Sequence, residues 1–339
     1  GSTSSNNNNN NNSHQDMAMK SAKWISVRNR TLTALFLMAF LAFLSHYFQQ
    51  DGLMAFVLVL QTLMYQETTT VIGGDFTNPI LKWWWFATAV ITINASKLYP
   101  WKSNMFQAIA YGMSLLSVIS TTCSLQLATT TTTTTTPSSS DSKQPRLLLF
   151  REYIRQAAVS ILSIVLVVLP SSYWIATLEE YGTTWVFVPA LFVILNDTMA
   201  YVGGQLLGRH KLLSHISPNK TWEGFLVAAI STVGAAVGLD AMVHNNNSNS
   251  NNNIISPKYY PLDRTDGLVL AVFASLVGPF GGFLASIIKR AYHRKDFGNL
   301  LPGHGGFVDR LDCQLVLAPF VYLYLHLYKF ATATSGTSG

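Results

Sequence analysis

Long apolar runs dominate this sequence and constrain its fold more than any other feature. A bilayer-spanning helix needs about 20 mostly apolar residues, and candidate runs lie at 31–48, 52–65, 83–95, 105–120, 157–175, 184–204, 225–243, 267–288 and 314–330. The second and third are short enough for an interfacial or re-entrant unit. Only 11% of the residues are charged, whereas soluble domains carry about a quarter. We therefore predict an all-α, polytopic integral membrane protein with about eight or nine transmembrane helices, against the alternative of a soluble helical bundle.

Low-complexity segments divide the chain. Four polar segments cannot bury a core and are predicted to be disordered or flexible: an Asn/Ser-rich tail at 1–19, a Thr/Ser linker at 126–146, an asparagine tract at 245–253 and a tail at 331–339. They leave N-terminal transmembrane helices at 20–125 and a catalytic transmembrane region at 147–330. Two cysteines, Cys123 and Cys313, provide neither a disulfide framework nor a thiolate metal cluster.

Basic residues indicate the orientation. Lys20, Lys23, Arg28 and Arg30 precede the first run, which predicts a cytosolic N-terminus. Later basic segments follow an even number of runs and return to the cytosolic side. The net charge of +6 is scattered between apolar runs. This distribution favours anionic lipid headgroups and phosphorylated substrates as partners, and not nucleic acid.

An ionisable residue lies inside one of the apolar runs. Asp197 interrupts the run 184–204. A charged side chain within a bilayer is costly, so it is a functional hypothesis by default. Asp197 could ligate a cation or act as a general base. The alternative is a buried aspartate that pairs with a neighbouring helix.

A second cluster combines a turn with a helix start. Ser217 and Pro218 predict a turn, and the next helix is expected to begin near Thr221. Free N–H groups at a helix N-terminus suit phosphate, and Lys220 adds a positive charge. Glu223 lies one turn into the helix. The alternative is an ordinary N-cap by Thr221, with Glu223 favourable to the helix dipole.

The third cluster, at 286–312, interleaves acidic residues with a Gly-His-Gly-Gly turn. Its aspartates are Asp296, Asp309 and Asp312, whose oxygens suit Mg²⁺ bridging nucleotide phosphates. Asp309 and Asp312 would share one helix face because they are three positions apart. His304 could be a general acid or a phosphate donor, or could simply cap the turn.

Cations surround these aspartates. Lys289, Arg290 and Lys295 could hold phosphates, with arginine better suited to bidentate contact. A basic loop that touches anionic lipid would explain the cations. It would not explain the interleaved aspartates.

These motifs resemble the phosphatidate cytidylyltransferases, also called CDP-diacylglycerol synthases. The family pattern is a serine, Lys-Arg, Lys-Asp, His-Gly-Gly, Asp-Arg and a final aspartate, found here as Ser286, Lys289-Arg290, Lys295-Asp296, His304-Gly305-Gly306, Asp309-Arg310 and Asp312. The eukaryotic branch adds motifs that match 196–201 and 217–225. Asn219 departs from the pattern, since the family often has lysine there. The resemblance covers 145–330 closely and 20–120 loosely.

The resemblance implies a Mg²⁺-dependent reaction of CTP with phosphatidate that gives CDP-diacylglycerol and diphosphate. It implies a lipid substrate held in the bilayer, and an endoplasmic reticulum protein whose site faces the cytosol. Whether the chain forms a homodimer is left open.

The resemblance also implies roles for individual residues. The expected catalytic residues are Asp296, Asp309, Asp312, Lys289 and His304. The expected substrate-binding residues are Ser217, Lys220, Thr221, Arg290, Lys295 and Arg310. The expected metal ligands are Asp197, Glu223, Asp296, Asp309 and Asp312.

Among rival functions, a CTP-dependent polyprenol or lipid kinase would transfer the γ-phosphate. A transporter would use Asp197 in an ion path, but no internal repeat supports it. An inactive lipid-binding scaffold would not need the full set of aspartates.

Overall fold

The described residues form a bundle of long helices with one small hairpin. The computed structural model describes residues 49–74, 79–98, 143–213, 217–247, 262–301 and 305–329, with isolated residues between 43 and 116. The elements are α2 (Gln49–Gly73), α3 (Pro79–Leu98), α5 (Lys143–Ser163), η2 (Ile164–Val168), α6 (Leu169–Glu180), α7 (Thr184–Leu207), β1 (Lys211–Leu213), β2 (Ser217–Thr221), α8 (Trp222–Asn247), α9 (Arg264–Leu276), α10 (Pro279–Ala291), α11 (Val308–Tyr324) and η3 (Leu325–Lys329). The predicted helical class is confirmed.

Within the described residues, five helical stretches are long and apolar enough to cross a membrane. They are Phe150–Glu180, Thr184–Leu207, Trp222–Ala241, Arg264–Ala291 and Val308–Tyr328. The runs at 52–65 and 83–95 lie within α2 and α3. The run at 31–48 and that at 105–120 fall almost wholly outside the described residues, so the count of eight or nine spans stays a prediction.

The predicted polar segments lie mainly outside the described residues. Two of their edges do not. The helix α5 begins at Lys143 and α8 reaches Asn247. The linker and the asparagine tract are therefore helical at these edges.

The outer surface of the bundle is apolar, as lipid contact requires. Leu191, Ile194, Leu226 and Ile230 are all more than half exposed on α7 and α8. Water would penalise so much exposed aliphatic surface, whereas lipid tails do not. The chain is an integral membrane protein.

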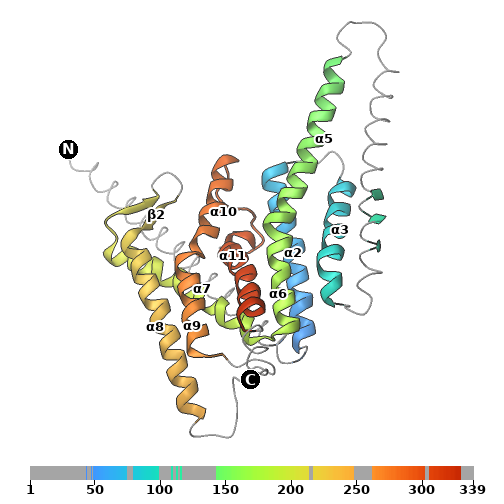
Figure 1. Ribbon diagram of the computed structural model, residues 1–339. Coiled ribbons are helices and arrows are strands. Elements are labelled where there is room, and N and C mark those ends of the chain that lie inside the picture. The colour runs from blue at the N-terminus through green and yellow to red at the C-terminus, as the bar shows by residue number, and fades with distance from the viewer. Residues whose placement is uncertain are drawn as a thin grey trace, which may run out of the picture.

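The core lies where α6, α7, α9 and α11 meet. Trp185, Phe192, Leu270, Leu317 and Val321 are almost completely buried in one cluster. On the other side of α11, α2 packs along α5, η2 and α6, and in Figure 1 this layer lies beside α10 and α11. The helix α11 is therefore the central element, with a partner on each side.

The run predicted at 267–288 is broken into two helices. The helix α9 ends at Leu276 and α10 starts at Pro279. Proline has no N–H for a continuing helix, and its fixed φ suits a first helical turn. A capping box fixes the start of α9. The Asp263 side chain accepts the backbone N–H of Asp266, and the Asp266 side chain accepts the backbone N–H of Asp263.

The helix start predicted near Thr221 is confirmed, whereas Ser217 and Pro218, which were predicted to form a turn, lie in the second strand of a hairpin. Lys211 pairs with Thr221 and Leu213 with Ser217 in an antiparallel two-stranded sheet. The helix α8 begins at Trp222. The hairpin lies beyond the end of α7 and delivers its polar residues to one end of the bundle (Figure 1).

Candidate functional site

A cavity of about 350 Å³ lies between α7, the hairpin, α10 and α11. Its lining includes residues from all three sequence clusters: Asp197, Ser217, Lys220, Thr221, Ser286, Asp309, Arg310 and Asp312. Apolar residues complete the wall, among them Phe225, Pro279 and Phe283. The cavity thus combines carboxylates, cations and hydroxyls beside apolar helix surface.

Lys220 belongs to this lining. Its Nζ lies 4.4 Å from the centre of the Phe283 ring, a distance typical of a cation–π contact. A Cβ on Gly282 would lie 3.3 Å from that Nζ and 3.4 Å from Oδ2 of Asp312. The glycine therefore gives the ammonium and the carboxylate room to flank the backbone of α10.

The second cavity carboxylate comes from α7. Asp197 interacts electrostatically with Lys220, Asp312 and Arg310. Its neighbour Asn196 is buried, and Oδ1 of Asn196 accepts a 3.4 Å hydrogen bond from Thr232 on α8. This contact fixes the turn of α7 from which Asp197 reaches the cavity.

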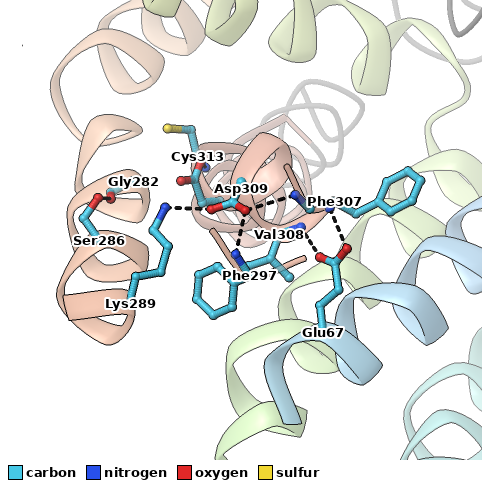
Figure 2. A network of polar contacts seen from close by, with 11 residues as sticks. Glu67, Gly282, Ser286, Lys289, Phe297, Phe307, Val308, Asp309 and Cys313 are labelled. Carbon is cyan, nitrogen blue, oxygen red and sulfur yellow. Dashed lines mark hydrogen bonds and ion pairs between the residues drawn. The ribbon is translucent and has the colours of Figure 1, made fainter. Parts of the chain in front are cut away.

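Asp309 lies in the cavity wall but is already fully engaged. Its Oδ1 is 2.6 Å from Nζ of Lys289, and its Oδ2 accepts hydrogen bonds from the amides of Phe297, at 2.8 Å, and Gly306, at 3.1 Å (Figure 2). The ion pair is sheltered, with the Asp309 side chain 5% exposed. Asp309 therefore ties the end of α10 to the loop before α11.

Several predicted site residues are not brought to the cavity wall. Arg290, Lys295 and Asp296 are exposed at the end of α10 and in the following loop. Asp296 borders Gly305, next to Asp309. Lys289 reaches the cavity only through Asp309. His304 lies outside the described residues.

Glu223 has a different partner from the one predicted. Its carboxylate lies 2.7 Å from Nδ1 of His210 and accepts the amides of Arg209 and His210. It joins the hairpin to α8 and does not line the cavity.

The expected metal ligands do not form one cluster. In the part of the chain that the structure describes, no group of three or more His, Cys, Asp or Glu side chains is placed to hold a metal ion. Asp197 and Asp312 share the cavity with Asp309, whereas Asp296 and Glu223 lie elsewhere. The Mg²⁺ site stays a prediction, and these positions narrow its candidates to the cavity carboxylates.

Two residues at the site were missed by sequence reasoning. Phe283 supplies the ring beneath Lys220. Glu67, on α2, accepts the amides of Phe307 and Val308 at the start of α11 (Figure 2). The only local sign of Glu67 is an isolated carboxylate following the apolar run 52–65.

Comparison with known proteins agrees with this geometry. The model of the cytidylyltransferase family matches residues 28–328. Phosphatidate cytidylyltransferase 1 of Arabidopsis thaliana is 34% identical over 203 residues, 51% of this chain and 48% of the relative. Phosphatidate cytidylyltransferase 2 of Homo sapiens is 37% identical over 198 residues, 48% of this chain and 44% of the relative. The match therefore spans less than half the length of these relatives.

The region matched by the family model, residues 28–328, contains every residue that lines the cavity, together with α2 and its Glu67. Since it also extends over most of the sequence, the chain belongs to the cytidylyltransferase family.

Proposed function

We propose that this protein is a phosphatidate cytidylyltransferase, which converts CTP and phosphatidate into CDP-diacylglycerol and diphosphate. The observation that carries the proposal is the cavity in which Asp197, Lys220, Arg310 and Asp312 meet at the ends of membrane helices. The names of the relatives support the same substrates. A phosphorylated lipid can keep its acyl chains in the bilayer while its phosphate enters such a cavity.

The proposed reaction needs no protein nucleophile. A phosphate oxygen of phosphatidate attacks the α-phosphorus of CTP and forms a new P–O bond. The bond between the α-phosphorus and the oxygen bridging to the β-phosphate breaks, and diphosphate leaves with that electron pair. Both reactants are anions, so the cations Lys220 and Arg310 offset their repulsion and hold them in line. Ser286 serves the fold, because its Oγ donates to the carbonyl of Gly282 at 2.7 Å.

The cavity carboxylates suit a hard divalent cation. Asp197 and Asp312 would hold Mg²⁺, because oxygen ligands are those it prefers and both line the cavity. When bound, Mg²⁺ supplies charge neutralisation at the phosphates. Asp309 would become a third Mg²⁺ ligand only if it gave up its contact with Lys289.

The location is part of the proposal. We place the cavity at the cytosolic face of the endoplasmic reticulum, because CTP is soluble and basic residues gather at this end of the bundle. Lys211 lies in the hairpin, Lys289 in the last turn of α10 and Arg294 just after that helix, as expected for cytosolic segments.

Isotope placement tests the reaction. The purified full chain would be incubated in nanodiscs with phosphatidate, Mg²⁺ and CTP labelled at either the α- or the γ-phosphorus. We expect the α-label in lipid, the γ-label in diphosphate, and no product with EDTA. The Asp312→Asn variant is the inactive control. Lipid that carries the γ-label would identify a CTP-dependent lipid kinase and overturn the proposal. Light scattering on the same sample would determine whether the chain forms a homodimer.

A further inference from the structure

A buried carboxylate from α2 caps α11, the helix that contributes Asp309, Arg310 and Asp312 to the cavity lining. Glu67 is 4% exposed. Its Oε1 accepts the amide of Phe307 and its Oε2 that of Val308, each at 3.0 Å. The donors lie 240 and 241 positions further along the chain. In Figure 2 the Glu67 side chain points from α2 directly at the start of α11.

The helix α11 lacks a cap of its own. Its N-cap residue, Phe307, makes no side-chain capping hydrogen bond. The first N–H groups of a helix have no partner within the helix, and the positive end of the helix dipole favours an anion. Glu67 supplies both the acceptors and the charge from a different helix. Asp309, Arg310 and Asp312 follow within the next turn.

Two glycines make room for this carboxylate. A Cβ on Gly298 would lie 2.6 Å from Oε1 of Glu67, and a Cβ on Gly306 would lie 2.5 Å from Oε2. Real Cβ atoms do not approach so closely. The three heavy atoms nearest to the Gly298 position all belong to the Glu67 side chain. The loop before α11 is thus shaped around Glu67.

A second carboxylate holds the same loop from the other side. Asp309 accepts the amides of Phe297 and Gly306, whereas Glu67 accepts those of Phe307 and Val308. The loop lies between two buried acceptors, and of these two only Asp309 forms an ion pair within the described residues, with Lys289. Glu67 does not line the cavity, and both of its oxygens already accept hydrogen bonds.

We propose that Glu67 is a positioning residue for the reaction. It fixes the backbone at Gly298 and Gly306 and the first turn of α11, so that Arg310 and Asp312 face the phosphates. The N-terminal helices would then belong to the catalytic unit and would not serve only as membrane anchors. The kinetic effects expected for Glu67 rest on the proposed function, whereas the expected structural effects do not.

Kinetics and amide exchange test this role together. In Glu67→Ala we expect kcat per folded molecule to fall about 10²-fold, since misplacement by about 1 Å costs that much. The KM values for CTP and phosphatidate should change by less than kcat, because Ser217 and Lys220 are not on α11. Amide exchange at 306–309 should accelerate at least tenfold. Glu67→Gln keeps one acceptor and should lie between. Gln66→Ala, on the exposed side of the same turn of α2, is the control.

A double-mutant cycle separates positioning from general destabilisation. Gly298→Ala alone should reproduce the fast exchange and the low kcat, because its Cβ meets the Glu67 carboxylate. In the Glu67→Ala background the same substitution should add almost nothing, since the space is then free. Equal effects of Gly298→Ala in both backgrounds would overturn the proposal, as would an unchanged kcat per folded Glu67→Ala molecule. If the wild-type chain forms no CDP-diacylglycerol, the proposed function fails while the exchange measurements still decide the role of Glu67.

Discussion

At the scale of single residues, the two aspartates of α11 have different surroundings. Asp309 is held by Lys289 and two backbone amides. Asp312 accepts the amide of Cys313 through Oδ1, while its Oδ2 lies beside Gly282, close to Lys220. This difference predicts that Asp309 mainly holds the loop and that Asp312 mainly serves the substrates.

Neutralising Asp309 should therefore cost stability. In Asp309→Asn the Lys289 ammonium stays buried without its counter-charge, which costs about 3 kcal/mol or more. We expect a lower midpoint of thermal unfolding in detergent, measured by size-exclusion after heating. Lys289→Met should relieve part of this loss when combined with Asp309→Asn. Asp312→Asn should lose activity with little loss of stability. An Asp309→Asn protein as stable as wild type would contradict this division of roles.

The Phe283 ring should affect binding more than stability. In Phe283→Leu the cation–π contact with Lys220 disappears, and such contacts contribute about 0.5–2 kcal/mol. The KM for a phosphate-bearing substrate should rise about 2- to 30-fold by that range. Leu284→Ala, which changes an exposed neighbour, should leave KM unaltered. Steady-state kinetics with CTP and phosphatidate varied in turn would measure both.

At the scale of elements, the approach of α7 to α8 sets where the hairpin residues lie. A Cβ on Gly224 would lie 2.6 Å from the carbonyl oxygen of Ala200 and 2.9 Å from the amide of Gly204. Small residues let membrane helices approach this closely. Lys220 and Thr221 come directly before α8, so the position of its first turn decides whether they reach the cavity.

A pair of glycine substitutions on α8 tests this dependence. Gly224→Ala meets backbone atoms that cannot move aside, so overpacking should cost about 1–3 kcal/mol and displace Lys220. Gly234→Ala has open space around its Cβ and should gain up to about 1 kcal/mol from helix propensity. Unfolding midpoints and turnover would be compared side by side. Tolerance of alanine at both positions would show that the contact is unimportant.

How far the sequence predicted these elements depends on the range of the forces involved. Apolar runs predicted the helices because a bilayer forces each segment to satisfy its own backbone. The hairpin at 211–221 was missed because its strands are short and carry no alternating apolar pattern. The contact between Glu223 and His210 was missed as well, because it depends on this hairpin.

The prediction of the site likewise succeeded for local motifs and failed for long-range contacts. The motifs identified Asp197, Lys220 and Asp312 from their neighbours in the sequence. Glu67 could not be recognised, because its donors lie 240 positions away and only packing of α2 against α11 brings them together. Exposure of Arg290 and Lys295 likewise depends on where α10 ends.

At the scale of the whole molecule, the two ends of the span Arg264–Ala291 should lie on opposite sides of the membrane. In sealed microsomes, Arg294→Cys should react with a membrane-impermeant maleimide at once if the cavity end faces the cytosol, as we propose. Thr265→Cys should react only after detergent is added. Both positions are exposed, and the unsubstituted chain measures the background from Cys123 and Cys313. Labelling of Thr265→Cys alone in sealed vesicles would reverse the proposed orientation.

The contact between Glu67 and α11 also has a consequence for biogenesis. The ribosome releases α2 long before the amides that Glu67 accepts, since the chain grows from its N-terminus. During that interval the carboxylate has no helix end to cap and must remain hydrated or protonated. Completion of the cavity is therefore coupled to the arrival of α11, the final described span. A nascent chain that stalls before this point would carry the cavity residues of α7 and the hairpin, yet could not combine them with those of α11.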